Sequence, residues 1–231
     1  MLRSFVLAAA LCSVFGCILP ATGAFAATRV QTYNVESPTY GIIGTYTNTI
    51  SETRHSAKVG TKLHVAVKIL DIPLFHEDAA REEWWRRHRL IAFRSLTDDD
   101  GRKISVTGRA EHGHFVIHST SDGTLIAPAQ VYPSNPWSPF LLKNGIMMST
   151  RTGRLTRVVV RDTGDVTATF DGHAMRVRQW FVDGAKHQIV WVDGRGSIVA
   201  FQTPEDGHTI TFVLKNRLEV QGRAIARLPQ R

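Results

Sequence analysis

The chain has 231 residues, of which 43% are hydrophobic and 21% charged, and its formal net charge is +8. An apolar fraction of this size can build a core, which excludes a wholly disordered polyelectrolyte and a collagen-like repeat. The 2 cysteines are too few for a disulfide-dense scaffold or for a multi-cysteine zinc or iron–sulfur site. The composition therefore predicts a globular protein.

The first 26 residues are predicted to be a secretory signal peptide. Arg3 is the single charge among the first 28 residues, and an almost unbroken apolar run extends from Ser4 to Leu19. Ala24 and Ala26 then place small residues at the two positions that a signal peptidase reads, so cleavage is expected after Ala26. An uncleaved anchor is the other interpretation, but it needs roughly 17 to 25 apolar residues to cross a bilayer.

Lipoprotein anchoring at Cys17 is the alternative to ordinary cleavage, because Val14-Phe15-Gly16-Cys17 loosely resembles a lipobox. Both cysteines, Cys12 and Cys17, lie in the leader, so the mature chain contains none. The predicted organisation is a signal peptide over 1–26 and a single all-β domain over 27–231. The predicted location is the periplasm.

Alternation of apolar and polar residues predicts strands along the mature chain. It is clearest from Lys62 to Ile69, where Leu63, Val65 and Val67 share one face. Asp-Gly dipeptides between the runs are typical of hairpin turns. The other predicted strands are Arg29 to Val35, Gly41 to Ile50, Leu90 to Thr97, Lys103 to Thr107, Phe115 to Ser119, Leu155 to Arg161, Met175 to Phe181, Gln188 to Val192, Ser197 to Gln202 and Thr209 to Leu214.

Helical signals are weak. The segment from Asp78 to Arg89 is rich in helix formers but has no single apolar stripe, and Pro136 to Asn144 can form only a short helix. The sequence therefore predicts an all-β fold, an antiparallel meander of about ten strands that forms a closed or half-open barrel. A curved sheet of this kind encloses an apolar cavity where side chains do not fill it.

Three stretches resemble an uncharacterised family of exported proteobacterial β-proteins, known as a domain of unknown function. They are Trp84 to Gly101, the loop from Pro133 to Trp137, and Thr152 to Leu155, although Arg86 to Arg89 replaces an acidic-Gly turn. The resemblance covers most of the mature chain and implies no catalytic residues. At the level of fold, the chain is also similar to lipocalin-like proteins and periplasmic lipoprotein-carrier half-barrels, which implies a lipid-like ligand.

Aromatic and cationic residues are the candidates for ligand binding. In an exported protein, the cluster from Trp84 to Arg89 suits anionic lipid headgroups or envelope polymers better than nucleic acid. The alternative is structural, with one Trp in the core and arginine stems covering apolar surface. A second basic group falls on two neighbouring predicted strands and is either a cationic binding stripe or a solvated strand face; it consists of Arg151, Arg154, Arg157, Arg161, Arg176 and Arg178. The candidate residues are Trp84, Trp85, Arg87, Arg89, Trp137, Arg176 and Arg178.

No metal site, cofactor or catalytic residue is predicted. His112 and His114 lie two residues apart and can share a metal ion, but no carboxylate or cysteine stands at a matching spacing. Ser134 has no Gly-x-Ser-x-Gly elbow around it. The paired carboxylates Glu82-Glu83 and Glu205-Asp206 are expected to be solvated, with unshifted pKa values.

The leading hypothesis is a non-catalytic periplasmic barrel that binds an apolar or amphipathic, lipid-like ligand. The alternative is a cell-envelope scaffold or accessory protein that docks on a partner, and the third is a hydrolase using Ser134 or the His112 and His114 pair. The predicted partners are a lipid or anionic envelope component, or an envelope protein, with peripheral membrane contact and no nucleic acid.

Overall fold

The computed structural model describes residues 27–70, 72–205 and 207–221. The predicted signal peptide, Cys17 and Asp206 lie outside these residues. The elements are β1 (Ala27–Ser37), β2 (Gly41–Glu52), β3 (Ser56–Ile69), β4 (Ile72–Arg86), β5 (Arg89–Asp99), β6 (Arg102–Glu111), β7 (His114–Ser119), β8 (Gly123–Pro128), β9 (Tyr132–Pro133), the 3₁₀ turn η1 (Pro139–Leu141), β10 (Gly145–Met148), β11 (Leu155–Phe170), β12 (His173–Asp183), β13 (His187–Val192), β14 (Ile198–Glu205) and β15 (His208–Gln221). Within the described ranges, no helix has the length and apolar character needed to cross a membrane.

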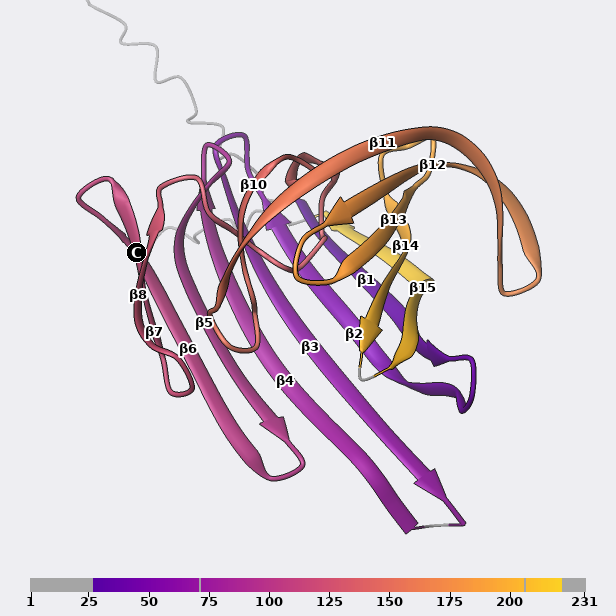
Figure 1. Cartoon of the computed structure of the whole chain (residues 1–231). Coiled ribbons are helices and arrows are strands. Elements are labelled where there is room, and N and C mark those ends of the chain that lie inside the picture. Colours follow the sequence, from indigo (N-terminus) through magenta and orange to yellow (C-terminus); the bar gives the residue numbers. More distant parts are fainter. Residues whose placement is uncertain (1–26, 71, 206, 222–231) are drawn as a thin grey trace, which may run out of the picture.

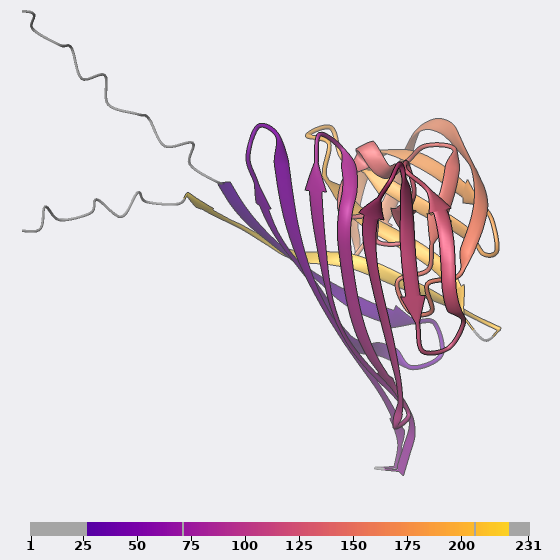
Figure 2. The same cartoon turned by 90° about the vertical axis from the view of Figure 1, so that its left-hand side faces the viewer.

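The strands form one 15-stranded sheet in the order β8-β7-β6-β5-β4-β3-β2-β1-β15-β14-β13-β12-β11-β10-β9. Neighbouring strands pair antiparallel, apart from the short parallel pair β9 and β10. The sheet curves so that β2 to β6 face the half formed by β11 to β15, as Figures 1 and 2 show. The all-β, barrel-like prediction is confirmed, although the strands outnumber the predicted ten and β8 and β9 remain separate edges.

Strand β4 occupies a stretch in which alternation predicted no strand. It pairs with β3 from Ile72 to Arg86, and its buried side chains include Ala79, Arg81, Glu83 and Trp85. These residues alternate along the chain, as the inward face of a strand requires. Two of these inward residues are charged, so the inner and outer faces of β4 do not differ clearly in hydropathy. The alternation of apolar and polar residues that predicts a strand is therefore absent from this stretch.

A segment that we call the crossing segment, residues 129–154, leads from β8, at one edge of the sheet, to β11 near the other edge. It contains β9, η1 and β10 and packs on the inner face (Figure 2). Trp137 and Leu141 are buried there, and Gly153, at φ +78°, lies so close to β7 that a Cβ would come within 3.0 Å of Ile117. The crossing segment therefore supplies part of the wall that an open sheet lacks.

Four aromatic rings pack together where the two halves of the sheet meet. Tyr46 makes edge contacts with Tyr33, Phe201 and Phe212 at centroid distances of 5.9, 5.6 and 5.3 Å. Phe201 and Phe212 stack at 4.3 Å. The Tyr33 hydroxyl donates a hydrogen bond to the carbonyl of Ile198 at 3.0 Å, so this buried polar group is satisfied. The cluster ties β1 and β2 to β14 and β15.

Candidate ligand-binding site

A cavity of about 730 Å³ lies between the inner face of the sheet and the crossing segment. Its wall is largely apolar, and it receives side chains from both halves of the sheet. Tyr46, Phe201 and Phe212 of the aromatic cluster form part of it. The aliphatic and other apolar wall residues include Val35, Ile43, Leu63, Val65, Val67, Phe75, Ile104, Met147 and Ile210. A space of this size and lining matches the sites that hold small apolar molecules.

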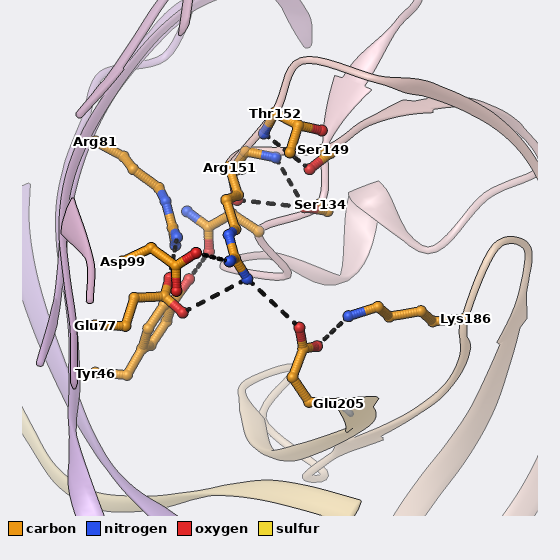
Figure 3. A network of polar contacts seen from close by, with 12 residues as sticks. Tyr46, Glu77, Arg81, Asp99, Ser134, Ser149, Arg151, Thr152, Lys186 and Glu205 are labelled. Carbon is orange, nitrogen blue, oxygen red and sulfur yellow. Dashed lines mark hydrogen bonds and ion pairs between the residues drawn. The ribbon is translucent and has the colours of Figure 1, made fainter. Parts of the chain in front are cut away.

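A network of charged groups crosses one side of this cavity (Figure 3). The Arg151 guanidinium, from the crossing segment, lies 4.0 Å from a Glu77 carboxylate oxygen on β4 and 3.7 Å from one of Glu205 on β14. It also donates a hydrogen bond to Asp99, and Lys186 pairs with Glu205. Arg151 thereby connects the two facing halves of the sheet.

The cavity presents more cationic than anionic side chains. Arg81, Arg102, Arg151, Arg154 and Lys186 line it, against the carboxylates Glu77 and Glu205. Burial raises the pKa of Glu77, while Arg81 and Arg151 act in the opposite direction. Because five cationic side chains line the cavity against two carboxylates, its electrostatic environment favours an anionic group.

Arg81 lies deep in the cavity with part of its hydrogen-bonding capacity unused. Its side chain is 8% exposed and approaches Glu77 at 3.9 Å, while its Nε atom has no hydrogen-bond partner among the described residues. Ser95 lies directly opposite Arg81 on β5, and Thr97 follows on the same face. The Ser95 and Thr97 hydroxyls are likewise buried without a partner in the described part of the chain. Buried polar atoms are normally hydrogen-bonded to protein, water or ligand. Arg81 Nε and the Ser95 and Thr97 hydroxyls can therefore form hydrogen bonds with a polar group of a ligand.

Glu83 occupies a different part of the interior and holds the crossing segment in place. Its Oε2 accepts hydrogen bonds from the indole N–H groups of Trp85 and Trp137, each at 2.9 Å, and its Oε1 accepts one from the Asn135 amide at 2.8 Å. The carbonyl oxygen of Asn135 accepts a hydrogen bond from the Tyr46 hydroxyl at 2.5 Å. These bonds join the crossing segment to strands β2 and β4.

The expectation that Glu82 and Glu83 are solvated with unshifted pKa values was wrong. Glu83 points inward and is fully buried, and burial raises its pKa to about 7. Glu82 points outward, where hydrogen bonds from Lys58 and Arg94 lower its pKa. The two neighbours differ because successive residues of a strand lie on opposite faces of the sheet.

Two of the predicted ligand-binding residues, Trp85 and Trp137, lie together in the interior. Their rings make an edge contact at 5.9 Å, and each ring also contacts Phe140. Trp84 lies on the outer face, with the Lys58 ammonium 5.3 Å from its ring. Both indole N–H groups of the inward pair bond to Glu83, so these two side chains are part of the packed core beside the cavity.

The predicted arginines lie apart from that pair, on the exposed surface. Arg87 is in the turn after β4, at φ +47°, and Arg89 begins β5. Arg176 and Arg178 lie on β12, where they pair with Asp165 and Asp162. None of the seven predicted residues is among the described residues that line the cavity.

The two histidines considered as metal ligands lie at the turn between β6 and β7. His112 adopts φ +42° in the turn and His114 begins β7, with its ring nitrogen 3.3 Å from the His112 carbonyl oxygen. His118 lies further along β7 and contacts Thr124 at 3.0 Å. His112 therefore does not share a regular strand face with His114.

Sequence reasoning did not place five polar residues in the interior, namely Glu77, Arg81, Glu83, Asn135 and Arg151. A signal was present for three of them, because Glu77, Arg81 and Glu83 have the same parity as Ala79 and Trp85. If residues 72–86 had been recognised as a strand, these three residues would have been placed on the same inward face as Ala79 and Trp85. No comparable signal exists for Arg151 and Asn135, which lie in irregular parts of the crossing segment.

Comparisons with known proteins identify a matching family model and a solved structure of similar fold. A family model described as Domain of unknown function (DUF6134) matches residues 41–215. Among solved structures, the chain is similar to a beta-barrel-like protein of domain of unknown function DUF1849 from Brucella abortus, with a TM-score of 0.63 and 10% sequence identity. That similarity covers 84% of this chain and 98% of the other, and it shows the fold alone. No curated protein matches the chain.

Proposed function

The chain belongs to the DUF6134 family of domains of unknown function, and we propose that it is a periplasmic, non-catalytic protein that binds an apolar or amphipathic, lipid-like ligand in its cavity. The observation that carries the proposal is a cavity of about 730 Å³ whose wall is mainly apolar and whose buried Arg81 has an unpartnered Nε among the described residues. Apolar walls with a few placed polar groups are typical of ligand sites.

Each part of the cavity has a role in this proposal. The aliphatic side chains of β3, together with Phe201 and Phe212, remove the apolar part of the ligand from water, at about 25 cal/mol per Å² of buried apolar area. Arg81 then binds the anionic headgroup by a charge-assisted hydrogen bond. Arg151 also lines the cavity, where it pairs with Glu77, Asp99 and Glu205.

Filling the cavity should weaken ligand binding. Val67 lines it from β3, so Val67→Trp is expected to weaken binding of a dansyl-labelled fatty acid by at least about tenfold, because the indole takes the space of the acyl chain. The matched control is Val159→Trp on β11, where the side chain is 49% exposed and the affinity should stay unchanged. Fluorescence titration measures both affinities. Native mass spectrometry of the protein purified from the periplasm should show a bound lipid, and its absence together with a failure to bind the probe would exclude the proposal.

The headgroup contact has its own test. Arg81→Met is expected to weaken binding of the anionic probe by roughly tenfold or more, since a hydrogen bond to a charged group contributes about 1.5–3 kcal/mol. Binding of the corresponding fatty alcohol, which lacks the negative charge, should change little. Arg176→Met is the control, because Arg176 is exposed and pairs with Asp165 on the neighbouring strand. If Arg176→Met has the larger effect, the binding surface lies on β12 instead of in the cavity.

A further inference from the structure

A second group of chemically active side chains lies on the outer face of the sheet, away from the cavity. His64 on β3 stands directly opposite Asp78 on β4, and His76 precedes Asp78 by two residues on the same face. The neighbours of His64 on β3, Leu63 and Val65, point inward and are buried. Strand alternation therefore directs the two imidazoles and the carboxylate to the same outer patch.

The three side chains converge closely. The His64 Nδ1 atom lies 2.7 Å from one Asp78 carboxylate oxygen, and the His76 Nε2 atom lies 3.1 Å from the other. One ligand atom from each residue lies within 4.8 Å of the other two. Zinc bonds to histidine nitrogen and carboxylate oxygen are about 2.0–2.2 Å long, so donors around one ion stand about 3–4 Å apart. Small side-chain rotations bring these three atoms to that spacing.

The backbone holds this arrangement on two adjacent strands. The Asp100 carboxylate accepts a hydrogen bond from the His76 backbone N–H at 2.7 Å, and the Asp100 N–H donates one to the His76 carbonyl at 2.9 Å. These bonds fix His76 at the point where it faces His64, with ring centroids 5.8 Å apart. Paired strands position the side chains of a site more precisely than a loop does.

The surrounding charges favour a cation. Asp98 lies opposite Asp78 on β5 and, with His64 and Asp78, lines a shallow hollow on this face. Lys62 is the cation that lines the same hollow. Asp78, Asp98 and Asp100 lie around the histidines, against Lys62 in the hollow and Lys103 opposite Asp98 on β6, and the excess of carboxylates lowers the cost of placing a divalent ion there.

We infer that His64, His76 and Asp78 form a binding site for a divalent transition-metal ion of the zinc or copper class. Two imidazoles and one carboxylate suit these ions better than calcium or magnesium, which prefer oxygen ligands alone. The side chains of His64 and Asp78 are 57% and 51% exposed, so the remaining coordination positions are open to water or to a small ligand. Nothing in this inference depends on the cavity or on its ligand.

Isothermal titration of the untagged, chelator-treated protein with zinc chloride tests the site. The expected result is one zinc ion per chain, with His64→Ala, His76→Ala and Asp78→Asn each weakening the affinity by at least about tenfold. His187→Ala is the matched control, because His187 is also an exposed histidine paired with a carboxylate, that of Asp183 at 2.7 Å. It should leave the affinity unchanged. The double variant of His112 and His114 to alanine should also bind zinc like the wild type.

Copper binding gives an independent readout of the ligands. The electron paramagnetic resonance spectrum of the Cu²⁺ complex should show coupling to two nitrogens in the wild type and to one in His64→Ala or His76→Ala. Circular dichroism of the metal-free variants should match the wild type, because the substituted side chains are exposed. The inference is overturned if the wild type binds no stoichiometric metal, or if the His64 and His76 variants retain full affinity.

Discussion

Glu83→Ala is expected to lower the free energy of unfolding by about 4 kcal/mol at pH 5. The substitution leaves the indole N–H groups of Trp85 and Trp137 and the Asn135 amide buried without their acceptor. Each unsatisfied donor costs about 1–3 kcal/mol, and the deleted side chain leaves a cavity. Denaturant unfolding followed by tryptophan fluorescence measures the change. Glu82→Ala, on the opposite face of the same strand, should cost less than about 1 kcal/mol because its partners are surface groups.

The same substitution should remove a pH dependence of stability. Burial raises the pKa of Glu83 from 4.5 to about 7, although hydrogen bonds from Asn135, Trp85 and Trp137 oppose the shift. The folded protein thus holds the proton more tightly than the unfolded chain does. The contribution that this difference in the pKa of Glu83 makes to the free energy of unfolding is fully present below about pH 4.5. It is lost as the pH rises to about 7.

The expected difference between wild type and Glu83→Ala therefore shrinks by roughly 2–3 kcal/mol between pH 5 and pH 8. Glu82→Ala should keep the wild-type slope in this window. A Glu83→Ala protein whose stability falls with pH as steeply as that of the wild type would show that another group carries the titration.

Trp137→Ala is expected to lower the free energy of unfolding by about 4 kcal/mol, which is large for a residue outside the main strands. The side chain is 2% exposed, packs on Trp85 and on Phe140 at 5.9 and 5.2 Å, and donates to Glu83. Thermal or denaturant unfolding measures the loss, and hydrogen exchange should localise increased opening to residues 129–154.

Trp84→Ala is the control for Trp137→Ala. Trp84 lies on the outer face beneath Lys58, and its removal should cost about 1 kcal/mol from a cation–π contact and partial burial. The double variant of Glu83 and Trp137 to alanine should lose less than the two single losses added together, because both variants remove the same hydrogen bond. Equal losses for Trp84→Ala and Trp137→Ala would contradict the assignment of Trp137 to the core.

The alternating strands were predictable because one face of each is apolar. The run from Lys62 to Ile69 shows this, and it lies within β3. Strand β4 was not predictable in this way because Arg81 and Glu83 point inward. Their inward placement depends on partners such as Asn135, which is 52 residues away from Glu83 in the chain. Local periodicity carries no information about a partner at that separation.

The candidate sites also depend on contacts that local sequence patterns do not predict. Residue types suggested that Trp84 to Arg89 form a ligand-binding cluster, but strand alternation and the following turn separate these side chains between the core and the exposed surface. His64, His76 and Asp78 come together through the pairing register of β3 and β4. Arg151 meets Glu77, Asp99 and Glu205 only through the curvature of the sheet. Neither register nor curvature follows from residue spacing alone.

The position of β1 and β15 has a consequence for the time course of folding. These strands begin and end the described chain, yet they pair with each other in the middle of the sheet, with Ala27 opposite Gln221. The two halves can therefore pair through β1 only once β15 has been synthesised. Pairing at this sequence separation has a large loop-closure entropy, so the joining step should be slow compared with hairpin formation. Until then, the apolar inner faces of both halves stay open to solvent and to any chaperone that binds unpaired strands.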